Sequence, residues 1–276
     1  MTDTAWIASY PRSGADRLRF LLAAYLLMDR TSTPDLDALR EVVPDFVRLF
    51  SRGRELPMDG SGPVAAKTLF KADAEVLRQY RPTEQKVVYL VRDPRDMILS
   101  TLRFLGIPEA ERVTFAKNCI AQRGVVPQWR NLGRGDWVEH VRAWTGTGTG
   151  TDAATVRGPV KVVRYEELHR DPAATLSSVV DFLGIGDGAD RDRAARAAAY
   201  ATPETAFEAL RAEIASGVKA LRRNAVPSFR PMPPDSGTLA DFGDDVEAEY
   251  RRLLAEDEEF AECVSRYGYA DANSAV

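Results

Sequence analysis

Apolar runs with strand character alternate with helical patterns along the first two thirds of the chain. One run begins at Ala5, and the others cover 64–68, 86–91 and 160–164. The run over 86–91 is β-branched and apolar over most of its length, as expected of a strand covered on both faces. The alternation predicts an α/β fold with a mostly parallel central sheet flanked by helices. Ligands of such sheets bind beyond the carboxyl ends of the strands.

Two Asp-Pro steps mark the starts of helices that follow strands. Asp93 can cap its helix with Pro94 as the first helical residue, and Asp171 with Pro172 repeats the device. Further helices are predicted over 36–43, 46–50, 137–144, 194–201, 203–214, 244–254 and 257–267, and one more helix is predicted to end at Tyr80. The remainder of 106–145 is expected to be irregular. We expect a single domain over 1–276, with mobile segments near 145–152 and 215–240.

Composition narrows the classes of partner. The 276 residues carry a formal net charge of −4, which argues against a general nucleic-acid binder because phosphate affinity needs a surplus of Lys and Arg. Cys119 and Cys263 are far apart and have no metal-ligand neighbours, a pattern typical of a reducing compartment without a zinc site. The apolar run 18–28 contains Arg19 and is too short to span a bilayer. We therefore expect a cytoplasmic protein with no nucleic-acid or membrane partner.

The first strand passes directly into a tight turn and a helix, in the row Tyr10-Pro11-Arg12-Ser13-Gly14. A helix that starts there leaves its first backbone N–H groups unpaired, which favours anion binding, and Arg12 adds a positive charge. The turn has a single Gly and no Lys-Ser/Thr pair, so it is not a Walker A loop. Strand-Gly-helix turns also occur in many α/β folds without an anion.

A second candidate site follows the strand over 86–91. Arg92 stands at the strand end and Ser100 lies two turns into the next helix, so both can hold a phosphate group. The alternative is that Arg92, Arg95 and Asp96 form an ion-pair network at the helix terminus.

Both segments resemble sulfotransferases of the cytosolic type. Tyr10, Pro11, Ser13 and Gly14 match the 5′-phosphosulfate loop Tyr-Pro-Lys-Ser-Gly-Thr-Thr-Trp, while 12 and 15–17 depart from it. The row Arg92-Asp93-Pro94-Arg95-Asp96 with Ser100 resembles the family's 3′-phosphate motif. Arg164-Tyr165-Glu166-Glu167-Leu168 is similar to a third family segment, Arg-Tyr-Glu-Asp-Leu. In overall character the chain looks most like bacterial sulfotransferases that tailor glycopeptide antibiotics.

The resemblance implies a P-loop-like sulfotransferase fold, the donor 3′-phosphoadenosine 5′-phosphosulfate (PAPS), its product PAP, and a small-molecule hydroxyl acceptor from secondary metabolism. It implies no metal. The implied cofactor-binding residues are Arg12, Ser13, Gly14, Ala15, Asp16, Arg17, Arg92, Ser100, Tyr165 and Arg230. Arg17 stands where relatives stack a Trp on adenine, and Tyr165 would lie near adenine or, alternatively, cap the core at the strand end. Arg230 is expected as a third phosphate contact.

The implied catalytic residues are Arg12, Asp16 and Lys67. Arg12 replaces the loop Lys that stabilises charge on the departing phosphate, and Lys67 would contact the sulfate, or else extend from the strand end toward solvent. The family's histidine base is replaced by Leu69. Asp16 could accept the proton instead, or it could cap the helix or pair with a nearby Arg.

The two histidines, His140 and His169, lie outside these motifs and are expected at the surface. Two alternatives stay open at this point: a PAP-binding relative without catalysis, and an ATP-dependent small-molecule kinase. The acceptor and the oligomeric state, including a homodimer, are not fixed by the sequence.

Overall fold

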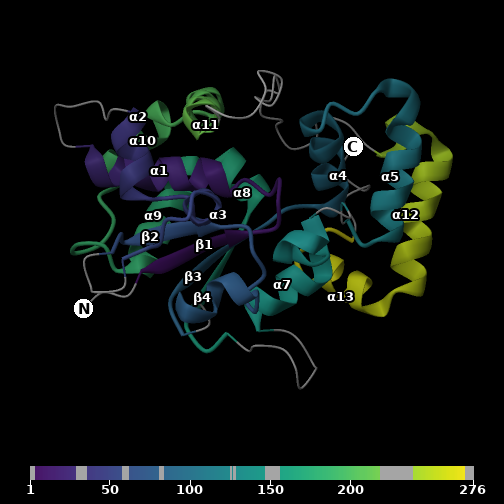
Figure 1. Ribbon diagram of the computed structural model, residues 1–276, viewed down its shortest axis with the longest axis horizontal. Helices are drawn as coiled ribbons and strands as arrows, with labels where there is room; N and C mark the ends of the chain where they lie inside the picture. Colours follow the sequence, from purple (N-terminus) through teal and green to yellow (C-terminus); the bar gives the residue numbers. More distant parts are fainter. Residues whose placement is uncertain are drawn as a thin grey trace.

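The computed structural model describes residues 4–28, 36–57, 62–80, 84–124, 126, 129–146, 156–217 and 239–270. Within them, four parallel strands form one sheet in the order β2-β1-β3-β4 (Figure 1). The strands are β1 (Ala5–Ser9), β2 (Ala65–Thr68), β3 (Val87–Val91) and β4 (Val160–Arg164). The predicted parallel α/β sheet is confirmed, with every strand within one residue of its expected bounds.

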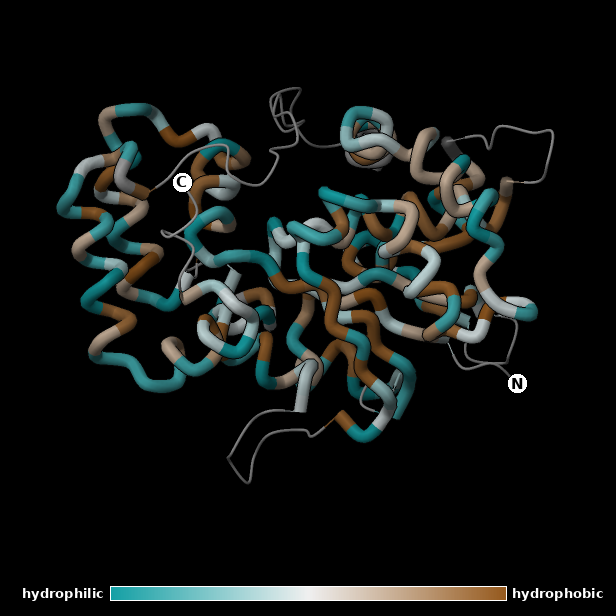
Figure 2. Tube along the Cα trace, turned by 180° about the vertical axis from the view of Figure 1, so that it is seen from behind, coloured by the Kyte–Doolittle hydropathy of each residue, from teal (hydrophilic) through white to brown (hydrophobic). Residues whose placement is uncertain are grey.

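Both faces of the sheet are buried, and successive side chains alternate between two hydrophobic cores. Trp6 of β1 and Tyr89 of β3 belong to one core, whereas Ile7 and Val88 belong to the other. Ile7 lies beside Val88 in the register of β1 and β3. Figure 2 shows hydrophobic residues concentrated in these central strands. The period of two explains why the strands read as nearly continuous apolar runs.

Helices cover the sheet on both sides (Figure 1). On one side lie α1 (Ala15–Leu27), α9 (Pro172–Leu183) and α10 (Arg191–Tyr200), and α2 (Leu36–Val42) and α11 (Pro203–Gly217) pack on α1. On the other side α7 (Trp137–Thr145) packs on β1, β3 and β4. Beyond α7 a second group gathers, made of α4 (Pro94–Phe104), α5 (Arg112–Ala121), α12 (Asp244–Glu256) and α13 (Glu258–Arg266). Short elements complete the described chain: α3 (Phe46–Ser51), α8 (Tyr165–Arg170), η1 (Glu75–Tyr80), η2 (Glu109–Glu111), η3 (Arg130–Arg134) and η5 (Leu239–Phe242).

The two Asp-Pro helix starts are confirmed. The Asp93 carboxylate accepts a hydrogen bond from the Arg95 backbone N–H at 2.8 Å, with Pro94 as the first residue of α4. The Asp171 carboxylate accepts from Ala174 at 2.9 Å at the start of α9. These caps fix where each helix begins after its strand, and therefore where the residues of its first turns lie.

Two elements differ from the sequence prediction. Helix α5 occupies part of the segment expected to be irregular, and it buries Ala116, Cys119 and Ile120, which share one helix face. Helix α8 begins directly at Tyr165, with acidic residues in its first turn and basic ones in its last, as the helix dipole favours. The two segments expected to be mobile fall largely on 147–155 and 218–238, which lie outside the described residues together with Arg230. Among the helices that the structure describes, none is both long and apolar enough to cross a membrane.

Candidate functional site

A cleft of about 470 Å³ opens beyond the carboxyl ends of the strands. Each strand end contributes to its wall: Ser9 from β1, Lys67 from β2, Arg92 after β3 and Tyr165 after β4. The cleft brings together most of the residues that the sequence predicts for the site, namely Arg12, Gly14, Ala15, Asp16, Arg17, Lys67, Arg92, Ser100 and Tyr165. Ser13 is buried just behind this wall, 1% exposed.

The turn after β1 adopts a backbone that few residues tolerate. Arg12 has φ 73° and Gly14 has φ 96°, both in the left-handed region. A Cβ atom on Gly14 would lie 2.5 Å from Cδ2 of Tyr165, so the ring packs directly against the glycine. The turn thus brings the N-terminus of α1, with its partial positive charge, into the cleft beside Tyr165.

Arg12 is half-buried, packs against α4 and lines the cleft. Its Nε donates to Ser100 Oγ at 3.1 Å, and its guanidinium lies over the Phe104 ring at 4.6 Å. Burial, with repulsion from Arg92 added, lowers the pKa of Arg12 to about 10. This contact joins the turn after β1 to Ser100, a residue that the sequence pairs with Arg92, although the two residues are 88 positions apart.

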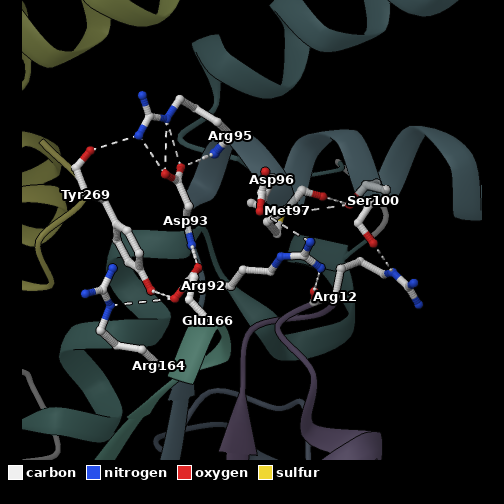
Figure 3. A network of polar contacts seen from close by, with 11 residues as sticks. Arg12, Arg92, Asp93, Arg95, Asp96, Met97, Ser100, Arg164, Glu166 and Tyr269 are labelled. Carbon is white, nitrogen blue, oxygen red and sulfur yellow. Dashed lines mark hydrogen bonds and ion pairs between the residues drawn. The ribbon is translucent and has the colours of Figure 1, made fainter. Parts of the chain in front are cut away.

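Arg92 lies beside Arg12 and is 2% exposed (Figure 3). Its Nη1 donates to the Arg12 carbonyl at 3.2 Å, and its Nη2 reaches Asp96 at 3.4 Å. The guanidinium stacks on the Tyr165 ring at 4.1 Å. The Nε atom has no hydrogen-bond partner within the described chain, and neither does the buried Ser13 hydroxyl.

Arg95 does not take part in the phosphate-like site. Its guanidinium binds both carboxylate oxygens of Asp93 and donates to the Tyr269 carbonyl at 3.0 Å (Figure 3). The Tyr269 hydroxyl in turn donates to Glu166 at 2.9 Å. Of the alternative ion-pair network of Arg92, Arg95 and Asp96, the structure contains only the pair between Arg92 and Asp96. Arg95 instead connects the chain after α13 to the ends of β3 and β4.

A buried ion cluster forms the floor of the cleft below β2. Lys67 is 2% exposed, and its Nζ lies 2.9 Å from Asp45 and 3.2 Å from Asp16. Asp45 also pairs with Arg48 at 3.0 Å. Although burial opposes ionisation, the cations Lys67, Arg19 and Arg48 hold the pKa of Asp45 well below its usual range. Lys67 is therefore enclosed rather than extended toward solvent, and Asp16 pairs with it in addition to lying 3.9 Å from Arg19.

Tyr165 and Arg17 occupy the side of the cleft next to α8. Arg17 Nη1 lies 3.2 Å from Nδ1 of His169, and burial lowers the pKa of Arg17. Tyr165 is 6% exposed, with its ring held between Gly14 and the Arg92 guanidinium. Both residues line the cleft, and the Tyr165 ring is buried directly after β4, as expected of a residue that caps the core at the strand end. Its contact with adenine stays a prediction.

The expectation that both histidines lie at the surface is wrong. His169 is half-buried against Arg17, and His140 is fully buried. His140 Nε2 lies 3.3 Å from the Leu69 carbonyl, which can only accept, so Nδ1 accepts from the Tyr89 hydroxyl at 2.9 Å. Burial lowers the pKa of His140 to about 3. His140 holds the chain after β2 through its contact with the Leu69 carbonyl, and it is not among the residues that line the cleft.

Several cleft residues were not predicted. Asp45 stands 22 positions from Lys67, and only the bridge between Asp45 and the edge of β2 brings the two together. The Pro44-Asp45 step indicates only the start of α3, which Asp45 caps, and does not reveal the pairing with Lys67. The other unpredicted residues are mostly apolar or aromatic and include Val47, Phe104, Trp129, Leu132 and Phe207. Within the described chain, no three His, Cys, Asp or Glu residues are grouped so that they could hold a metal ion.

The fold and the cleft define a P-loop-like α/β protein in which the turn after β1 lines the cleft. The Sulfotransferase domain family matches residues 2–201, so the chain belongs to that family. It is 30% identical to Sulfotransferase 2A6 of Rattus norvegicus over 105 residues, 37% of this chain and 32% of that protein. It is 25% identical to Sulfotransferase 4A1 of Homo sapiens over 190 residues, 65% of this chain and 59% of that protein. These matches span about a third to three fifths of the relatives' lengths.

A solved structure shows the same fold over almost the whole chain. The crystal structure of mouse sulfotransferase SULT7A1 complexed with PAP superposes with a TM-score of 0.55 and 17% identity, covering 97% of this chain and 90% of that one. The predicted sulfotransferase fold is therefore confirmed.

We predict that Gly14→Ala lowers the free energy of unfolding more than Gly53→Ala. Both glycines have positive φ, but a Cβ on Gly53 meets nothing within 4 Å. Gly53→Ala should therefore cost only the left-handed strain of roughly 1–2 kcal/mol, and Gly14→Ala should add the clash with Tyr165. Urea unfolding of the two variants measures the difference. Equal losses would show that Tyr165 does not confine Gly14.

We predict a loss of stability in acid that depends on His140. Because the folded pKa is about 3 and an unfolded histidine titrates near 6.5, the unfolded state binds more protons between these values. The stabilising effect is present above the unfolded pKa and is lost as the pH falls. Between pH 7.5 and 5.5 the free energy of unfolding should drop by about 1 kcal/mol more in the wild type than in His140→Gln. The same pH dependence in both proteins would contradict the assignment.

Proposed function

We propose that this protein is a PAPS-dependent O-sulfotransferase that transfers a sulfuryl group to a hydroxyl of a small molecule. The observation that carries the proposal is the placement of two arginines, the half-buried Arg12 and the buried Arg92, in one cleft at the ends of neighbouring strands. The unpartnered Arg92 Nε and Ser13 hydroxyl are donors of the kind that phosphate oxygens require. PAPS, when bound, supplies the sulfuryl group that is transferred.

We assign the donor-binding residues by their positions. Arg92 would bind the 3′-phosphate together with Ser100, and the turn 12–17 would bind the 5′ side through Arg12, Ser13, Gly14 and the first backbone N–H groups of α1. Tyr165 and Arg17 lie on the side of the cleft next to α8, which supports a contact of both residues with adenine. Arg230 stays a predicted phosphate contact. Family membership and the PAP complex of the mouse neighbour support the donor.

The chemistry of this chain's residues would be positioning and charge stabilisation. Arg12 would hold the departing phosphate oxygen, where negative charge grows during transfer. A planar guanidinium clamps several oxygens at once, unlike the single ammonium point charge of a lysine. Lys67, paired with two carboxylates, would act chiefly by holding Asp16 in place.

Asp16 is our candidate for the proton acceptor. Leu69 lines the cleft where relatives resembling this chain carry a histidine, and it cannot take a proton. Of the two carboxylates among the described lining residues, Asp45 is enclosed by cations, whereas the Asp16 side chain is 30% exposed. A hydroxyl acceptor in the cleft could therefore reach Asp16.

The proposal also covers the chemical class of the acceptor and the cellular compartment. The apolar lining supports a natural product with an aromatic or aliphatic body, in keeping with the resemblance to antibiotic-tailoring enzymes. Cys119 and Cys263 are buried free thiols, which supports work in the cytoplasm. Leu69, which replaces the family's histidine, favours a second hypothesis: that the protein binds PAP without catalysis. Turnover measurements distinguish this hypothesis from an active sulfotransferase.

We predict that Arg92→Ala weakens PAP binding roughly 10- to 100-fold, the usual loss for a hydrogen-bonded charge pair. Arg12→Ala should have an effect of similar size. Arg78→Ala, at a side chain that is 77% exposed on η1, serves as the control and should bind PAP like the wild type. Isothermal titration calorimetry measures all four proteins. Wild-type affinity in both cleft variants would end the assignment of this cleft to the donor.

We predict that Asp16→Asn lowers kcat by roughly 10²- to 10⁴-fold, the range for loss of a general base. PAP binding should be unchanged or tighter, since a negative charge near the donor is removed. Asp73→Asn, which loses an ion pair with Lys71 and does not line the cleft, is the matched control. Sulfation is followed with any acceptor that the wild type converts. An unchanged kcat in Asp16→Asn would show that another group takes the proton.

A further inference from the structure

Arg134 is a cation of the cleft that neither the donor assignment nor the proton transfer uses. It lines the cleft, and its Nε is buried without a hydrogen-bond partner among the described residues. No carboxylate there lies within ion-pair distance of it. Asp45 is the carboxylate whose charge acts on it, and Asp45 already pairs with Lys67 and Arg48. Burial lowers the pKa of Arg134, as expected of a cation without a close counter-charge.

The backbone on both sides of Arg134 is anchored to the strands that end at the reacting side of the cleft. The Gly133 carbonyl accepts from the Lys71 N–H at 2.9 Å, three residues beyond the end of β2. The Gly135 carbonyl accepts from the Tyr10 hydroxyl at 3.3 Å, directly after β1. Gly133 and Gly135 both have positive φ, which lets the chain turn sharply around Arg134. Its position is thus fixed by the fold.

The strand order separates Arg134 from the nucleotide side. In the order β2-β1-β3-β4, the donor residues Arg92 and Tyr165 stand at the ends of β3 and β4. Arg134 is anchored after β2 and β1, on the side where Leu69 and Lys67 line the cleft. An anion held by Arg134 would therefore belong to the acceptor rather than to the adenylate.

Apolar surface surrounds this cation. Its guanidinium lies 5.8 Å from the Trp129 ring centre, and Trp129 packs edge-on against Tyr10. Leu132, on the same turn as Arg134, lines the cleft yet is 55% exposed, and Val47 and Leu69 also line it. A flat apolar wall with one undercompensated cation fits a molecule with an aromatic body and an acidic group.

Resting on the proposed function, we infer that the acceptor is a hydroxy acid. Its apolar body would lie on Trp129 and Leu132, its carboxylate would bind Arg134, and its hydroxyl would face Asp16 and Arg12. Arg134 is thus a residue that determines specificity. It binds acceptors with a negative charge more tightly and takes no part in the sulfuryl transfer itself. A guanidinium gives two parallel hydrogen bonds to a carboxylate, which a neutral ester cannot accept with equal strength.

The test compares acids with their own esters. The probes are 4-hydroxybenzoate, 4-hydroxyphenylacetate and 3-(4-hydroxyphenyl)propanoate, each beside its methyl ester, so that the spacing between hydroxyl and carboxylate is varied. Binding to the PAP-loaded protein is measured by calorimetry. We expect at least one acid to bind the wild type roughly 10- to 100-fold more tightly than its ester. Arg134→Gln should abolish this preference, and Arg134→Lys should retain part of it.

Arg130→Gln is the matched control. Arg130 lies on the same turn, but its side chain is 49% exposed, pairs with Asp136 and does not line the cleft. This variant should keep the acid preference. All variants should bind PAP like the wild type, which shows that they are folded.

Each result separates the two proposals. No PAP binding by the wild type would contradict the proposed function. PAP binding without any preference for an acid, including the case in which no probe binds, would overturn the role of Arg134 alone. An equal loss of kcat for acids and esters in Arg134→Gln would place Arg134 on the donor and would also overturn it.

Discussion

Two like charges are held side by side in this protein because β1 and β3 are neighbours in a parallel sheet. Both strands end at the same edge, so the turn after β1 brings Arg12 against Arg92, and Arg92 donates to the Arg12 carbonyl. Their mutual repulsion is offset by the ion pair between Arg92 and Asp96 and by the faces of two rings, those of Phe104 and Tyr165. Aromatic faces and a carbonyl dipole stabilise cations without neutralising them. The proposed binding of an anion with several negative charges depends on this pair.

The surroundings of this pair are rigid. Asp93 caps α4 and simultaneously binds Arg95, which reaches the Tyr269 carbonyl, while Glu166 at the start of α8 accepts from both Tyr269 and the Asp93 N–H. The segment after α13 is thus fastened across the ends of β3 and β4. Ser100 and Arg92 consequently keep a fixed distance from each other before any ligand arrives, which reduces the entropy lost on binding.

Features encoded by neighbouring residues could be predicted from the sequence. The strands, the Asp-Pro helix starts and the turn at Gly14 all have local signals, and the strand order then forces Arg12 and Arg92 to one edge. The ion cluster had no such signal, because Asp45 meets Lys67 only through a bridge to the edge of β2. His140 was misjudged for the same reason: the Leu69 carbonyl and the Tyr89 hydroxyl that satisfy it come from distant strands. Arg134 depends on anchors to Tyr10 and Lys71 that no spacing reveals.

The arrangement of carboxylates supports the proposal that Asp16 accepts a proton in a cleft where Leu69 replaces the family's histidine. If Lys67 had a single partner, protonation of that carboxylate would leave a buried ammonium uncompensated, which is strongly unfavourable. Here Lys67 lies between Asp16 and the more deeply buried Asp45. Because the cations around Asp45 keep it ionised, Lys67 retains a counter-charge when Asp16 becomes neutral. The ion pair with Asp45 thus leaves Lys67 compensated if Asp16 takes up a proton.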